Sequence, residues 1–129
     1  MRLHPVFGYD ALKAIVGVAP EVLDAIRHHH EYLDGTGYPD GLVAGQIADI
    51  VRLLTVSDIF AALIEARSYR PRMPRAKAYG IVCEMEGKLE PALVRAFQQV
   101  ALKGQKVPRK RRRPDGVLRS GCGAFQARR

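Results

Sequence analysis

A long apolar stretch in the middle of the chain constrains the fold most strongly. From Gln46 to about Arg67, apolar residues recur at roughly helical spacing, which predicts one long helix with an apolar side. The stretch also carries charges at Asp49, Arg52 and Asp58, which make it a poor membrane span. The residues expected on the apolar side are Ile47, Ile50, Val51, Leu54, Ile59, Leu63 and Ile64.

Prolines and glycines divide the rest of the chain into shorter helical segments. Helices are predicted over residues 3–16, from Pro20 to the Asp34-Gly35 pair, over 74–86, and from Pro91 to about residue 103. A glycine-rich loop is predicted over residues 34–45. Because no segment shows strand alternation and the length fits one domain, we predict an all-α fold of about five helices.

The positive charge of the chain is confined to its C-terminal end. Residues 1–102 hold eleven Lys/Arg against twelve Asp/Glu, whereas residues 103–129 hold ten Lys/Arg and a single Asp. This terminal stretch lacks apolar periodicity, so it cannot bury enough surface to offset its ordering entropy. We expect one helical domain over residues 1–103 and a disordered basic tail over residues 104–129. With no leader sequence or membrane span predicted, the expected location is cytoplasmic.

The stretch HHHEYLDGTGYPDGL, residues 28–42, joins a histidine cluster to the glycine-rich loop. A histidine binds a metal ion through one ring nitrogen while an acceptor holds the other nitrogen. On a helix, His29 and His30 would point about 100° apart, so they could share one ion only at a helix end, or else bind two adjacent ions. His4 and Asp58 could complete a set of nitrogen and oxygen ligands that suits iron, manganese or zinc better than calcium. Taken singly, each of these residues is more often structural or solvated.

Three segments of the chain resemble the HD-GYP family, whose members are bacterial HD-type phosphohydrolases that act as cyclic di-GMP phosphodiesterases. HHE at 29–31, two spacer residues and DGTGYPDGL at 34–42 are similar to the signature of that family. HPVFGYDALKAI at 4–15 and VSDIFAALIEARSYRPRMPRAKA at 56–78 are similar to its flanking segments. The resemblance covers about residues 3–102 and implies a partial HD-domain helical bundle.

The resemblance also implies roles for individual residues in a metal-dependent reaction on a phosphodiester. The implied metal ligands are His4, His29, His30 and Asp58. The implied substrate-binding residues are Gly37, Tyr38 and Pro39 in the loop, and Arg67 and Arg70, whose guanidinium forks suit phosphate groups. No further catalytic side chain is implied, because a pair of metal ions can activate a water molecule as the nucleophile.

Other interpretations of these residues stay open. Tyr38 could be a surface aromatic that packs the loop, and Arg67 and Arg70 could be cations favoured by the dipole at a helix C-terminus. Glu31 could accept a hydrogen bond from a histidine or could be solvated. His28 is extra to the aligned pair, and we expect it at the surface.

Two parts of the family pattern have no counterpart in this chain. The family carries an upstream His-Asp doublet, followed shortly by a lysine, that supplies ligands to both metals, and no His-Asp pair occurs here. A second aspartate is expected where Ala61 stands. We therefore expect an N-terminally truncated domain, an incomplete binuclear site for iron or manganese, and little or no turnover by the chain alone.

Three functions remain to be distinguished. The first is hydrolysis of cyclic di-GMP at a metal centre. The second is non-catalytic: a degenerate domain would use the loop around Tyr38 and Pro39 to bind a partner protein, such as a GGDEF-type cyclase. The third and weakest is non-specific nucleic-acid binding through the basic run RKRRR at 109–113.

Overall fold

The computed structural model describes residues 2–103, and within them the fold is all-α, as the sequence predicts. The described residues contain no strand, only two isolated β-bridges. The expected disordered tail, residues 104–129, lies outside the described residues, and the division at 103/104 stays a prediction. The elements are α1 (His4–Lys13), α2 (Pro20–His28), a 3-10 helix η1 (Ala44–Gln46), α3 (Asp49–Ile64), α4 (Arg75–Glu84) and α5 (Pro91–Ala101).

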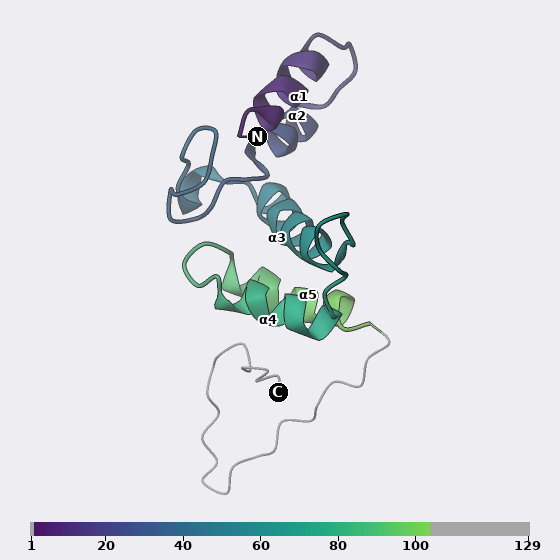
Figure 1. The fold of residues 1–129 in the computed structure, drawn as a ribbon. Coiled ribbons are helices and arrows are strands. Elements are labelled where there is room, and N and C mark those ends of the chain that lie inside the picture. Colours follow the sequence, from purple (N-terminus) through teal and green to yellow (C-terminus); the bar gives the residue numbers. More distant parts are fainter. Residues whose placement is uncertain (1, 104–129) are drawn as a thin grey trace, which may run out of the picture.

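Helices α1 and α2 form a hairpin at one end of the molecule, and α3 leads from it to the α4–α5 pair (Figure 1). Pro5 and Pro20 lie in the first turns of α1 and α2, where a missing N–H costs no helical hydrogen bond. A Cβ atom at Gly8 would lie 3.0 Å from Cγ2 of Ile26, so the glycine lets the two helices approach closely. This close approach brings the start of α1 beside the end of α2.

The hydrophobic core lies between α3, α4 and α5. The rings of Phe60 and Phe97 meet edge to face, with centroids 5.2 Å apart, and the hydroxyl of Tyr79 donates a hydrogen bond to the Val94 carbonyl oxygen at 2.9 Å. Burial of these apolar side chains is the main contribution to the stability of this part of the chain. The buried cluster comprises Val56, Phe60, Ala78, Tyr79, Val82, Leu89, Val94, Phe97 and Ala101.

The apolar side expected for the long helix is only partly correct. Val51 is buried, but Ile50 and Leu54, expected on the same side, are exposed, with 53% and 38% of their surfaces accessible. Thr55 and Phe60 are buried instead. The reason is that α4 and α5 cover only one face of α3, and periodicity alone does not reveal which apolar face they cover. Over residues 2–103, no helix combines the length and apolar character that crossing a membrane needs.

Helix α2 ends at His28, five residues before the end that the sequence predicts. Residues 31–33 leave the helix because they find partners elsewhere in the chain. The Leu33 N–H donates to the Lys88 carbonyl oxygen at 2.9 Å, and the Glu31 side chain accepts hydrogen bonds from the loop. The early end places His29 and His30 in the turn after the helix, so the helical angle expected between them does not apply.

Candidate metal centre

Three histidine side chains from two separate segments converge at the junction of α1 and α2. His4 opens α1, and His29 and His30 follow the last residue of α2. The Nε2 atom of His4 lies 3.0 Å from Nε2 of His30 and 3.4 Å from Nε2 of His29. Two ligand atoms about 2.1 Å from one metal ion at angles of 90–110° would be separated by about 3.0–3.4 Å. The two distances therefore fit imidazoles arranged around a common cation.

The environment of His29 favours the tautomer that a metal ligand needs. Its Nδ1 atom lies 2.8 Å from the carbonyl oxygen of Ile26, so Nδ1 carries the proton and donates it there. Nε2 then has its lone pair free and faces the Nε2 atom of His4. This carbonyl contact is the kind of outer partner that fixes the ring orientation of metal-binding histidines.

The surroundings of His30 also favour a neutral ring. Burial lowers the pKa of His30 below its usual 6.5, and the neighbouring His29 and His4 lower it further, while the Asp58 carboxylate opposes them. A neutral imidazole is the form that binds metal, so these effects work in the direction of coordination. The group of candidate ligand atoms that lie within 4.8 Å of one another consists of His4, His29 and His30.

Asp58 lies outside this histidine group but close to it. Its negative charge acts on three predicted site residues: it raises the pKa of His30, of Tyr38 and of Arg67, in each case as a lesser effect. Asp58 sits in the middle of α3, which carries it toward the α1–α2 junction. The structure therefore puts the predicted carboxylate in the electrostatic neighbourhood of His30 and Tyr38.

The loop that follows α2 folds back over the histidines. The Tyr38 N–H donates to the His30 carbonyl oxygen at 3.2 Å, and the two rings stack with centroids 4.9 Å apart and 18° between their planes. The Tyr38–Pro39 peptide bond is cis. A Cβ atom at Gly37 would come within 2.4 Å of the Glu31 Cα and within 2.5 Å of the His30 carbonyl oxygen. Only glycine permits this approach, so Gly37 allows Tyr38 to reach His30.

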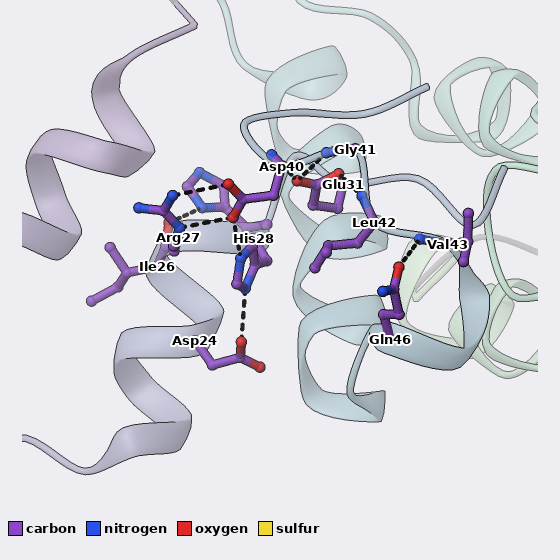
Figure 2. A network of polar contacts seen from close by, with 11 residues as sticks. Asp24, Ile26, Arg27, His28, Glu31, Asp40, Gly41, Leu42, Val43 and Gln46 are labelled. Atoms are coloured by element: carbon purple, nitrogen blue, oxygen red, sulfur yellow. Dashed lines mark hydrogen bonds and ion pairs between the residues drawn. The ribbon is translucent and has the colours of Figure 1, made fainter. Parts of the chain in front are cut away.

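Glu31 anchors the part of this loop that follows Pro39. Its carboxylate is buried, with 2% of its surface exposed, and accepts hydrogen bonds from three consecutive backbone N–H groups (Figure 2). The donors are Asp40 at 2.6 Å, Gly41 at 3.1 Å and Leu42 at 2.9 Å. Glu31 is therefore neither solvated nor bonded to a histidine, and its role is to anchor the loop. Sequence reasoning missed this role; a carboxylate just before a glycine-rich loop was its only local signal.

Lys88 fastens the same loop to the connection between α4 and α5. Its Nζ atom donates to Asp34 at 3.0 Å and to the Thr36 hydroxyl at 2.6 Å, and lies over the Tyr32 ring. The Thr36 hydroxyl, the Thr36 N–H and Lys88 together lower the pKa of Asp34 to about 2, with the hydroxyl the largest cause. The loop is thus tied both to α2 and to the part of the chain that carries the core.

The two predicted phosphate-binding arginines lie in a tight turn after α3. Arg67 and Arg70 exchange backbone hydrogen bonds of 3.0 Å, and the Arg67 side chain is exposed, with its guanidinium 3.3 Å from the Tyr69 hydroxyl. Arg70 donates from Nη2 to the Ala62 carbonyl oxygen in the last turn of α3, at 2.7 Å. This contact matches the alternative of a cation at a helix C-terminus for Arg70.

His28, expected at the surface, is mostly buried. Only 14% of its side chain is exposed, and its ring nitrogens lie 2.7 Å from an oxygen of Asp24 and 2.8 Å from an oxygen of Asp40. The expectation was wrong because Asp40 approaches from the loop, twelve residues further along the chain. His28 thus connects α2 with the loop that covers the histidine group.

Comparison with known proteins agrees with this arrangement. The family model described as HD domain matches residues 1–93. Cyclic di-GMP phosphodiesterase PA4108 of Pseudomonas aeruginosa is 37% identical over 97 residues, which cover 75% of this chain and 23% of the relative. The response regulator RpfG of Xanthomonas campestris pv. campestris, also named a cyclic di-GMP phosphodiesterase, is 38% identical over 100 residues, which cover 75% of this chain and 26% of RpfG. 3'3'-cGAMP-specific phosphodiesterase 3 of Vibrio cholerae is 48% identical over 65 residues, which cover 50% of this chain and 14% of that relative.

The chain spans about a quarter of the length of the first two relatives. The matched region includes all three converging histidines, the loop and α3. The predicted resemblance is confirmed: this chain belongs to the HD domain family, and it is similar to proteins named cyclic di-GMP phosphodiesterases.

Proposed function

We propose that this chain carries part of the metal centre of a cyclic di-GMP phosphodiesterase of the HD-GYP type. The observation that supports this most directly is the convergence of His4, His29 and His30, with Nε2 separations of 3.0 and 3.4 Å that suit a shared cation. Relatives with cyclic di-GMP phosphodiesterase names share this part of the sequence.

In this proposal the three imidazoles and the Asp58 carboxylate hold divalent cations, with iron or manganese as the expected ions. A bound cation would activate a water and neutralise phosphate charge, which is the chemistry that phosphodiester hydrolysis needs. Among the side chains, exposed Arg67 offers guanidinium donors to a phosphate. Arg70, bound to the end of α3, keeps the turn that carries Arg67 in place. Gly37, Tyr38 and Pro39 form the wall beside the histidines.

The non-catalytic alternative, a loop that binds a partner protein such as a cyclase, fits these contacts less well. Tyr38, its expected contact residue, is half-buried and stacked on His30. A partner that took up Tyr38 would have to separate it from a candidate metal ligand. The basic run proposed for nucleic-acid binding lies outside the described residues and adds nothing to this comparison.

The test is metal content and hydrolysis by the purified chain. We expect binding of Mn²⁺ or Fe²⁺ that is lost in His29→Ala and His30→Ala, and at most weak hydrolysis of cyclic di-GMP, because the His-Asp doublet has no counterpart here. 3'3'-cGAMP serves as the competing substrate, because one of the relatives is specific for it. Equal metal content in wild type and both histidine variants would contradict the proposed site.

A further inference from the structure

One carboxylate in the loop, that of Asp40, binds two consecutive residues at the end of α2, Arg27 and His28. Its two oxygens accept hydrogen bonds from the Arg27 guanidinium, from Nε at 2.8 Å and from Nη2 at 2.9 Å. The His28 Nε2 atom lies 2.8 Å from one of the same oxygens. Figure 2 shows Arg27 and His28 reaching from the end of α2 to this side chain. A two-pronged guanidinium–carboxylate pair fixes direction as well as distance.

These contacts extend to both helices that supply histidines. The second ring nitrogen of His28 lies 2.7 Å from Asp24, one turn earlier in α2, so the ring cannot rotate freely. The Arg27 guanidinium also lies over the ring of Tyr9, 5.3 Å from its centroid. Tyr9 belongs to α1, the helix that begins with His4. Asp40 is therefore connected through Arg27 to α1 as well as to α2.

The same stretch of loop is also held from the other side of the histidine pair. Glu31 binds the backbone N–H groups of Asp40, Gly41 and Leu42, as described above. His29 and His30 thus lie between residues 27–28, which bind the Asp40 side chain, and residue 31, which binds the backbone N–H groups of residues 40–42. With both flanks fixed, the direction of the chain through His29 and His30 is set by the loop.

We infer that Asp40 is a positioning residue for the metal centre: its carboxylate holds α1, α2 and the loop in the arrangement that brings the imidazoles of His4, His29 and His30 together. The inference rests on the proposed function, since it assigns a purpose to the geometry of that centre. Binding sites tolerate misplacement of a ligand by only about 0.5 Å, so a contact that sets ligand direction affects affinity even though it touches no metal. The side-chain hydrogen bonds of Asp40 go to Arg27 and His28, the two residues that precede the histidine pair.

The electrostatics of Asp40 agree with this role. The Arg27 guanidinium, and after it His28, lowers the pKa of the Asp40 carboxyl to about 2, so the carboxylate is charged at neutral pH. A matched control exists on α1: Asp10 forms a comparable pair with Lys13 at 2.6 Å, but both side chains are about half exposed. The hydrogen bond of Asp10 goes to Lys13, and its charge is only a minor influence on the pKa of Arg27, so this variant removes an aspartate while keeping the Asp40 contacts.

The experiment measures the affinity of the full chain for Mn²⁺ by titration calorimetry, and the visible ligand-field absorption of bound Co²⁺, which reports ligand geometry. In Asp40→Ala we expect Mn²⁺ affinity to fall about 10–100-fold, as for outer partners of metal ligands, with a changed Co²⁺ spectrum. Asp40→Asn keeps one acceptor oxygen and should recover part of the affinity. Asp10→Ala should leave both readouts unchanged. All variants are measured at a temperature where circular dichroism shows them folded.

The outcomes separate this inference from the proposed function. If wild type binds Mn²⁺ and Asp40→Ala binds it equally well with the same Co²⁺ spectrum, the inference is wrong and the metal centre stands. If wild type binds neither ion, the proposed centre is wrong and the inference falls with it. If Asp40→Ala does not fold, Arg27→Gln removes the same pair while keeping Asp40, and an unchanged affinity in that variant overturns the inference.

Discussion

The two ends of this molecule are stabilised in different ways. In the site half, comprising α1, α2 and residues 29–46, the only buried residues are Pro5 and Glu31, and hydrogen bonds and ion pairs join its loop to α2 and to Lys88. In the core half, comprising α3, α4 and α5, nine buried residues form one apolar cluster. The histidines belong to the half that buries the least apolar surface.

This difference follows from what each half has to do. Apolar contacts stabilise a fold in proportion to the area buried but impose little direction. Hydrogen bonds between charged groups impose direction, and a metal centre needs ligands held at defined angles. The loop contacts of Glu31, Asp40 and Lys88 supply direction to the site half, while the core half supplies the platform to which Lys88 ties it.

The largest effect is expected from a truncation in the core half. Phe97→Ala removes a ring that is 8% exposed and packed against Phe60, and should lower the free energy of unfolding by about 3–5 kcal/mol. The matched control is Phe7→Ala on α1, where 65% of the residue is exposed and the change should stay within about 0.5 kcal/mol. Thermal and urea unfolding followed by circular dichroism provide the measurement. Equal losses in both variants would contradict the division into two halves.

A smaller and more local effect is expected from Glu31→Ala. The variant leaves three backbone N–H groups of the loop without their acceptor. The free energy needed to open the loop should therefore fall by about 3 kcal/mol, the upper end for unpaired buried donors. Amide hydrogen exchange of residues 40–42 measures it, with amides of α5 as the internal reference. Glu31→Gln keeps one oxygen acceptor and should lose less. If exchange in the loop stays as slow as in wild type, Glu31 is not its anchor.

The next effect concerns the approach of the loop to His30. In Gly37→Ala the new methyl group would meet backbone atoms at 2.4–2.5 Å, so the loop must move away, at a cost of about 1–3 kcal/mol. The ring-current shift that Tyr38 imposes on His30 protons should then disappear from the NMR spectrum. Gly45→Ala is the control, because a Cβ atom there has no neighbour within 4 Å. A preserved shift in Gly37→Ala would mean that the loop accommodates the methyl group without moving.

The sequence predicted the elements of the fold better than their packing. The all-α class and the five helices follow from local signals, because proline, glycine and apolar spacing act on the chain where they stand. The end of α2 was misplaced because the partner of Leu33 is Lys88, 55 residues away. The exposure of Ile50 was missed for a similar reason, since it depends on where α4 and α5 pack.

The candidate site shows the same limit. The histidines were found because of their spacing and the family resemblance, and the structure brings three of them together. The contacts that hold them were not predicted: His28 was placed at the surface, Glu31 was left open, and Asp40 was not singled out. Each acts through a partner in another segment, and a single sequence gives no measure of which polar side chains will meet.

The smallest expected effect is a difference in acid response, and it tests whether the two halves are coupled. The Thr36 hydroxyl and Lys88 lower the pKa of Asp34 to about 2 from a usual 3.8. A carboxyl whose folded-state pKa is lowered stabilises the fold above the unfolded value, and this contribution is lost as the pH falls from about 4 to about 2. The apolar contacts of the core half do not titrate in this range. We therefore expect the Thr36 amide signal to shift with a midpoint near pH 2 while signals of the Phe97 ring stay constant.

The control for this titration is Asp34→Asn, which cannot ionise and should flatten the curve of Thr36. A midpoint near pH 4 in wild type would show that the Thr36 and Lys88 contacts do not persist in solution. Lys88 lies between α4 and α5, so its contact with Asp34 is a direct polar connection from the loop to the core half. If acid releases Asp34 and the core signals shift with the same midpoint, the halves are coupled through Lys88. If they do not shift, the site half can open while the core stays intact, and the geometry of the histidines then depends on the loop contacts alone.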